Sequence, residues 1–209
     1  MSDPRTRIVG KGYDAIASEY LEWAARIVGD PKMHYLGKLA ERLLPGARIL
    51  ELGCGAGEPC TRRLAERFRV TGVDISGEQI RRARTNVPSA EFVQDDFVAL
   101  ELAETSFDAV AAFYSLNHVP RELLGGLFAS VHRWLQPGGL FLASLGVGET
   151  DSWTGSWLGT TMFFSSWDPD TNRRLLGEAG FELLLDDLVS MHEPEPSGTS
   201  TFQWVLARR

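Results

Sequence analysis

The chain has 209 residues, of which 44% are hydrophobic and 23% are charged, a composition typical of one soluble globular domain. Its formal net charge of −7 argues against a nucleic-acid partner, because contacts to phosphates need a basic surface. We find no run of about 18 apolar residues and no apolar segment near the first residue, so we expect no membrane partner, no secretory signal and a cytoplasmic location.

Strand-like and helix-like segments alternate along the chain. Short apolar runs predict strands at 47–52, 70–75, 90–94, 107–116 and 140–145, and helical patterns predict helices at 60–68, 76–87, 121–135 and 169–180. Ser76 and Gln79 have the spacing of a capping box, which marks the start of the second of these helices. Repeated strand–helix units predict a mostly parallel α/β sheet with helices on both faces.

The last two predicted strands, 181–189 and 201–208, have no helix between them. The connecting loop of about a dozen residues is too short for a helical crossover, so we expect these strands to pair as an antiparallel hairpin. Ligands of such sheets bind beyond the carboxyl ends of the strands.

The segment ILELGCGAGEP, residues 49–59, follows the first predicted strand with three closely spaced glycines. A dinucleotide-binding loop would carry another glycine at position 58, where this chain has Glu58. Glu58 and Glu51 would repel a phosphate, which disfavours a nicotinamide oxidoreductase. A cationic ligand without phosphates fits better, and S-adenosylmethionine, with its sulfonium and ammonium groups, is such a ligand.

This segment resembles the first motif of the class I S-adenosylmethionine-dependent methyltransferases, of the type that acts on small molecules. Further similarities are FDAVAAFYSLNHVP at 107–120, LQPGGLFLAS at 135–144 and YDAIASEY at 13–20, the last being similar to a segment that lids the cofactor. The resemblance implies a Rossmann-like seven-stranded sheet whose last strand is antiparallel. It also implies the cofactor S-adenosylmethionine and the product S-adenosylhomocysteine.

The resemblance assigns roles to residues at matching positions. Asp74, 21 residues after Gly53, would accept from the ribose hydroxyls, and Asp96 would accept from the adenine amino group, with Phe97 beside the base. The expected cofactor residues are Tyr13, Tyr20, Glu51, Gly53, Cys54, Gly55, Asp74, Ile75, Gln79, Asp96, Phe97 and Phe113. Two alternatives stay open: Asp74 as a cap of the following helix, and the two tyrosines as helix-packing aromatics.

Methyl transfer requires the acceptor atom to lie in line with the methyl group, and a base only if the acceptor loses a proton early. We take His118 and His192 as candidate catalytic residues, although His118 could instead hold its loop and His192 could be exposed. The candidate substrate residues are His34, Tyr114, Asn117, Trp153, Trp157, Phe164 and Trp167. No aspartate ends the fourth predicted strand and the chain has two cysteines, so we expect no metal site.

The long segment 146–168 carries six large apolar side chains that must be buried somewhere. We expect a single domain, 1–209, in which 1–45 form a helical cap and 146–168 form a lid over the substrate. Core packing and a dimer contact are the alternatives for that segment, and the chain could be a monomer or a homodimer.

These observations predict a methyltransferase that modifies a small, apolar or aromatic molecule at oxygen or nitrogen. The alternatives are a non-catalytic methyltransferase-like activator of a partner and an S-adenosylmethionine-binding enzyme of another reaction class.

Overall fold

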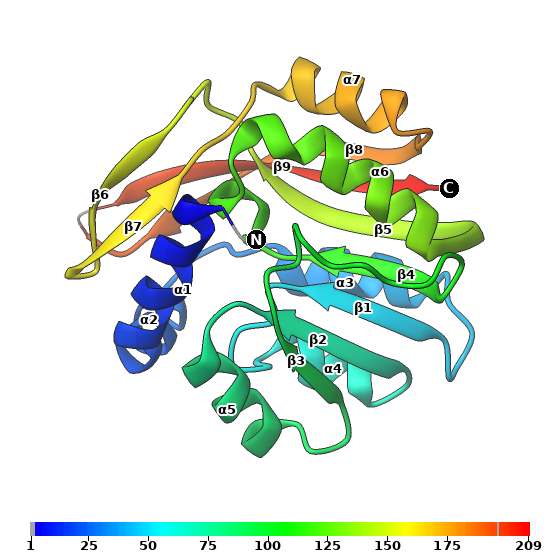
Figure 1. The fold of residues 1–209 in the computed structure, drawn as a ribbon, viewed down its shortest axis with the longest axis horizontal. Coiled ribbons are helices and arrows are strands. Elements are labelled where there is room, and N and C mark those ends of the chain that lie inside the picture. Colours follow the sequence, from blue (N-terminus) through cyan, green and yellow to red (C-terminus); the bar gives the residue numbers. More distant parts are fainter. Residues whose placement is uncertain (1–2, 196) are drawn as a thin grey trace.

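A seven-stranded sheet forms the centre of the protein in the computed structural model, which describes residues 3–195 and 197–209 (Figure 1). The strand order is β3-β2-β1-β4-β5-β9-β8. The strands are β1 Arg48–Leu52, β2 Arg69–Asp74, β3 Glu91–Gln94, β4 Phe107–Ala112, β5 Leu135–Gly146, β8 Glu182–Glu193 and β9 Gly198–Arg208. β9 pairs antiparallel with both β5 and β8, and the other pairs are parallel. The predicted fold class, with its antiparallel last strand, is confirmed.

Alternating side chains of the central strands bury both faces of the sheet. On one face, Leu50 of β1 and Phe141 of β5 pack in the same core as α6 (Leu124–Trp134) and α7 (Pro169–Glu178). On the other face, Ile49 and Leu142 pack in the same core as α3 (Lys32–Ala40) and α4 (Cys60–Ala65). Strands covered on both faces are apolar throughout, which is why they read as continuous hydrophobic runs.

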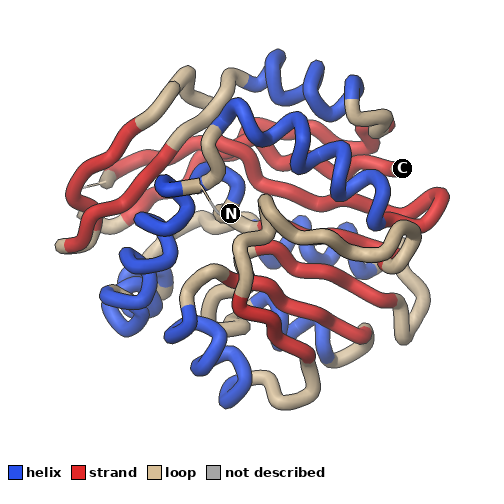
Figure 2. The backbone as a smooth tube through the Cα atoms, viewed as in Figure 1, coloured by secondary structure: helices blue, strands red, loops and turns tan. Residues whose placement is uncertain are grey.

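Helices α1 (Pro4–Ala15) and α2 (Ala17–Ala24) lie away from these layers, beside a separate two-stranded hairpin. The hairpin consists of β6 (Trp153–Trp157) and β7 (Thr160–Phe164), and it lies next to the helices in Figure 2. Segment 146–168, for which the sequence pattern indicated no strand or helix, therefore contains regular structure. Leu158 and Gly159 both have positive φ, as the two central residues of a type I′ hairpin turn require.

The last two strands of the main sheet are longer than their sequence pattern indicates. β8 and β9 continue to Glu193 and from Gly198, so the connection is four residues long instead of about a dozen. Conversely, β4 ends at Ala112, and Tyr114 beyond it has φ +55, outside the strand conformation. The antiparallel pairing of the terminal hairpin is as predicted.

The helix start predicted from Ser76 and Gln79 is half correct. α5 (Gly77–Asn86) begins there, and the Ser76 hydroxyl accepts from the Gln79 backbone N–H at 3.1 Å. The return contact of a capping box is missing, because the Ser76 backbone N–H donates to Asp74 Oδ1 instead. Two short 3-10 helices complete the described elements: Leu116–His118 follows β4, and Arg121–Leu123 precedes α6.

Candidate active site

The glycine loop after β1 has a backbone shape that side chains would not allow. Gly53, Gly55 and Gly57 have φ values of +75°, +53° and +78°. A Cβ on Gly53 would lie 2.3 Å from Ser115 Cβ, so this position has no room for a side chain. The Gly53 backbone N–H donates to the carbonyl oxygen of Val73 at 2.8 Å, which ties the loop to β2.

Asp74 ends β2 directly opposite this loop. Its Oδ2 accepts from the Gly55 backbone N–H at 2.8 Å, and its Oδ1 accepts from the Ser76 backbone N–H at 2.9 Å. Burial raises the pKa of the Asp74 carboxyl to about 6, although these two hydrogen bonds lower it. The carboxylate thus orders the loop, and it also lines a cavity beyond the strand ends.

Asp96, on the loop after β3, lines the same cavity. Its Oδ1 accepts from the Val98 backbone N–H at 3.1 Å, and its Oδ2 accepts from the Thr6 hydroxyl of α1 at 2.7 Å. This cavity measures about 50 Å³ and is also lined by Gly53, Ile75 and Phe97, and by Val9 and Tyr13 of α1. We call it the carboxylate cavity.

Four of the expected cofactor residues lie beneath or behind the loop instead. Glu51 is buried facing α4, where the Thr61 hydroxyl donates to its Oε2 at 2.6 Å, and burial raises its pKa to about 8. Cys54 packs under the loop against α5, and Phe113 packs in the sheet core. Gln79 is buried, and neither its Oε1 nor its Nε2 has a hydrogen-bond partner among the described residues. Their contact with the cofactor stays a prediction.

These residues fit the polar groups of S-adenosylmethionine. Asp74 and Asp96 offer carboxylate oxygens to hydroxyl and amino donors, and Phe97 and Ile75 offer apolar surface. The Gln79 amide, which has no hydrogen-bond partner in the described part of the chain, lies beside the loop. A Cβ built on Gly55 would be 3.9 Å from Gln79 Oε1. Burying an amide that makes no hydrogen bonds costs free energy, so we expect a ligand or a water molecule to supply the missing hydrogen bonds.

A second and larger cavity adjoins the first. It measures about 300 Å³, and Tyr13 and His118 line both cavities. The predicted substrate residues Tyr114, Asn117, Trp153, Trp157 and Phe164 line it, together with Tyr20. It is further lined by Trp23, Ala24, Ile27, Lys32, Met191, Glu193, Ser200 and Phe202, none of which the sequence pattern indicated. We call it the aromatic cavity.

Tyr13 and His118 are hydrogen-bonded where the two cavities meet. His118 Nδ1 lies 2.8 Å from the carbonyl oxygen of Phe163, which can only accept, so Nδ1 carries the proton. The unprotonated Nε2 therefore accepts from the Tyr13 hydroxyl at 2.9 Å. Burial lowers the pKa of His118 to about 4, so its ring is neutral at pH 7.

Three of the predicted residues lie outside the aromatic cavity. His34 is exposed on α3, edge-on to the buried Tyr35. His192 is exposed on β8, where its backbone pairs with Val28. Trp167 instead stacks on Arg121, whose guanidinium carbon lies 3.9 Å from the ring centroid.

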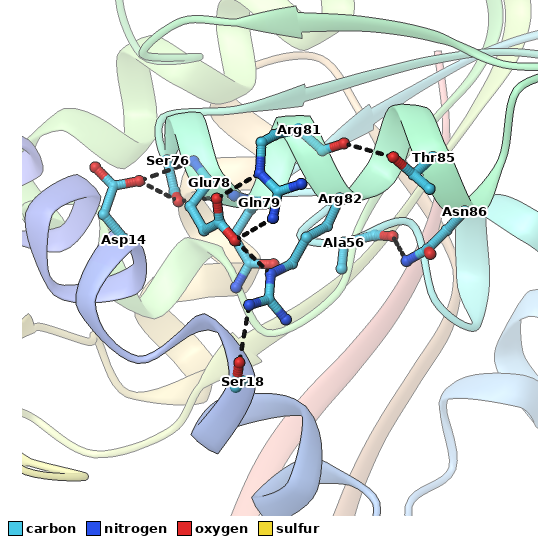
Figure 3. Close-up of polar contacts among 10 residues, drawn as sticks. All are labelled: Asp14, Ser18, Ala56, Ser76, Glu78, Gln79, Arg81, Arg82, Thr85 and Asn86. Carbon is cyan, nitrogen blue, oxygen red and sulfur yellow. Dashed lines mark hydrogen bonds and ion pairs between the residues drawn. The ribbon is translucent and has the colours of Figure 1, made fainter.

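The N-terminal helices are fastened to α5 by side chains (Figure 3). Asp14 Oδ1 accepts from the Ser76 hydroxyl at 2.7 Å and from the Glu78 backbone N–H at 3.0 Å. Arg82 donates to the Ser18 hydroxyl at 2.8 Å. We call these contacts the N-terminal clamp. They hold α1, which carries Thr6 and Tyr13, over the carboxylate cavity.

Within residues 3–195 and 197–209, no helix is both long and apolar enough to cross a bilayer. The same residues contain no group of three or more His, Cys, Asp or Glu side chains arranged to hold a metal ion.

Comparison with known proteins finds relatives that match the segment carrying this site. The sequence model of a family described as a methyltransferase domain matches residues 49–139, the segment that contains the glycine loop, Asp74 and Asp96. An uncharacterized methyltransferase of Synechocystis is 29% identical over 170 residues, covering 78% of this chain and 79% of that protein. The 27-O-demethylrifamycin SV methyltransferase of Amycolatopsis mediterranei is 33% identical over 160 residues, covering 66% of this chain and 58% of that enzyme.

Several other curated relatives are much longer than this chain, which spans about a third of their length or less. Among solved structures, the complex of DhpI with SAH superposes with a TM-score of 0.71 at 26% identity, covering all of this chain and 98% of the other. The matching segment carries the loop and both carboxylates, and the superposition covers the whole chain, so the comparisons support a class I S-adenosylmethionine-dependent methyltransferase with S-adenosylmethionine as its cofactor.

Proposed function

We propose that this methyltransferase modifies an oxygen or nitrogen atom of a small, aromatic or apolar molecule held in the aromatic cavity. The observation that supports this most is the junction of the two cavities at Tyr13 and His118. A volume of about 300 Å³ suits a small organic molecule. The Amycolatopsis relative is named as acting on a small molecule, which agrees with this proposal.

The two cavities are expected to bind different molecules, the cofactor in the carboxylate cavity and the acceptor in the aromatic cavity. Asp74, Asp96 and Phe97 would hold the nucleoside part of the cofactor, while the loop glycines admit it close to the backbone. Bound S-adenosylmethionine supplies an electrophilic methyl group, which leaves sulfur with the bonding pair remaining on sulfur as the new bond to the acceptor forms. The aromatic walls orient the acceptor and exclude water from it.

Tyr13 and His118 give a route for the acceptor's proton. As the acceptor's oxygen or nitrogen bonds to carbon, its proton passes to the Tyr13 oxygen while the Tyr13 proton passes to His118 Nε2. A neutral imidazole with a low pKa is a weak base, so it suits a proton that leaves together with bond formation instead of beforehand. The segment 146–168 covers this acceptor in the proposal, because Trp157 and Phe164 of the hairpin line the cavity.

The test is methyl transfer to a panel of small aromatic and apolar compounds with hydroxyl or amino groups, followed by mass spectrometry of product and of S-adenosylhomocysteine. We expect acceptor-dependent release with at least one compound, and a large fall in turnover for His118→Gln while calorimetry shows nearly unchanged cofactor binding. Turnover confined to macromolecular acceptors would refute the proposal. Cofactor binding without any acceptor-dependent turnover would favour a binding protein or another reaction class.

A further inference from the structure

The aromatic cavity has an unequal distribution of charge. Among the described residues that line it, the side chains with a formal charge are Lys32 and Glu193. Lys32 already has a counterion, because its Nζ lies 2.8 Å from Asp30 Oδ2, with the two side chains 18% and 12% exposed. Asp30 is also fixed by the Tyr114 hydroxyl, which donates to its Oδ1 at 2.7 Å. The Lys32 charge is therefore neutralised within the protein.

Glu193 has no such counterion. It is the last residue of β8 and is 9% exposed, and it forms no ion pair with any lysine, arginine or histidine in residues 3–195 and 197–209. Burial raises the pKa of the Glu193 carboxyl, although the hydroxyls of Ser197 and Ser200 act to lower it. Burying a carboxylate without a cation is costly, because two hydroxyl groups replace only part of its lost hydration.

Aromatic rings that line the same cavity lie at steep angles to one another. The Trp23 and Trp157 rings lie edge to face with their centroids 5.3 Å apart, and Tyr13 and Tyr20 lie edge to face at 5.1 Å. The faces of tryptophan and tyrosine rings carry partial negative charge and attract ammonium groups. Burial is the main cause that raises the pKa of Tyr13 and Tyr20, and the charge of Glu193 adds a smaller contribution to both.

We infer that the methyl acceptor carries a cationic nitrogen, separate from the atom that is methylated, and that Glu193 selects it by pairing with that charge against the aromatic rings. This inference rests on the proposed function, since it assumes that the acceptor occupies the aromatic cavity. Glu193 is then a specificity-determining residue, positioned where the extended ends of β8 and β9 reach the cavity.

The test uses matched probes that differ in charge but little in shape. Arylalkylamines such as tyramine are titrated by calorimetry into the protein saturated with S-adenosylhomocysteine, and each is compared with its alcohol (tyrosol) and its acid (4-hydroxyphenylacetate). We expect the amines to bind about tenfold more tightly than the alcohols, because a hydrogen bond to a charged partner contributes more than one to a neutral partner. The acids should bind most weakly.

Substitutions assign the preference to Glu193. Glu193→Gln should abolish the preference for amines, and Glu193→Asp should retain part of it. Glu195→Gln removes the same charge from an exposed neighbour outside the cavity, so it is the matched control and should keep the full preference. Melting temperatures show that each variant is folded.

The inference is overturned if no amine in the series binds more tightly than its alcohol, or if the preference survives in Glu193→Gln. Its failure differs from failure of the proposed function. Efficient methylation of neutral or acidic small molecules alone would overturn the inference and keep the proposed function. Selective binding of amines with no methylation of any small molecule would overturn the proposed function, and Glu193 would then select a cationic ligand that is not a methyl acceptor.

Discussion

The dependence of stability on pH gives a direct test of the buried imidazole at the centre of the site. Burial lowers the pKa of His118 from 6.5 to about 4, so between these values the unfolded chain binds a proton that the folded chain excludes. Stability is complete above pH 6.5 and falls as the pH is lowered toward 4. The slope for one proton is about 1.4 kcal/mol per pH unit, which gives a loss of roughly 3 kcal/mol over this range.

Buried Glu51 makes the protein less stable as the pH rises, which is opposite to the effect of His118. The pKa of Glu51 is raised from 4.5 to about 8, so its contribution is complete below pH 4.5 and is lost as the pH rises toward 8. Between pH 4.5 and 6.5 the two slopes oppose each other, and the curve of the wild type alone would conceal both. The informative quantity is the difference in unfolding free energy between the wild type and each variant.

The assay is urea unfolding, followed by tryptophan fluorescence, at half-unit intervals from pH 4 to 8.5. The advantage of the wild type over His118→Gln should grow by about 1.4 kcal/mol per unit up to pH 6.5 and then stay constant. Its advantage over Glu51→Gln should shrink with a similar slope from pH 4.5 to 8. His34→Gln, which removes an exposed imidazole, is the control. A flat difference curve for His118→Gln would show that folding leaves the pKa of this ring unchanged, as for a hydrated ring, and the proton route through Tyr13 would lose its basis.

Two further substitutions test the two cavities. Asp74→Ala should weaken binding of S-adenosylhomocysteine by at least about tenfold, since each charge-assisted hydrogen bond contributes about 1.5–3 kcal/mol, and Asp74→Asn should retain part of the affinity. Calorimetry measures this, with NAD as the control ligand, and an unchanged dissociation constant in folded Asp74→Ala would refute the ribose assignment. Trp157→Ala should raise the acceptor KM or lower kcat and leave cofactor affinity nearly unchanged. A loss of about 3–5 kcal/mol in the free energy of unfolding with unchanged kinetics would instead indicate that Trp157 packs in the core. A lower mass on a sizing column would indicate that Trp157 lies in a dimer contact.

Local signals in the sequence predicted most strands of the sheet, and the resemblance to a known family singled out the carboxylates of the carboxylate cavity. The glycines of the loop and the acidic residues at 74 and 96 each follow an apolar run directly, so the topology of a parallel sheet brings them to one edge. The hairpin β6–β7 had no such signal, because Leu158 at positive φ is a residue that rarely marks a turn.

The aromatic cavity could be predicted only in part, since tertiary contacts assemble it. Glu193 of β8 is distant in the chain from Trp23 of α2 and Lys32 of α3, which line the same cavity. The content of 146–168 indicated buried aromatics correctly, but composition does not tell which ring faces the cavity. Trp167 shows this, since its indole N–H donates to the carbonyl oxygen of Arg121 and its ring packs against the main core.

The position of α1 has a consequence for the order of events in turnover. The carboxylate cavity, about 50 Å³ in this conformation, is too small for a nucleoside until Thr6 separates from Asp96 and the N-terminal clamp loosens. Tyr13 lines both cavities, so the helix that must lift to exchange the cofactor also shapes the acceptor's binding surface. We therefore expect the cofactor to enter first and its spent form to depart last. The helix movement, not the chemical step, would then set the steady-state rate. In rapid-mixing experiments such an enzyme forms one equivalent of methylated product in a burst, and its slower subsequent rate falls as the viscosity of the solvent rises.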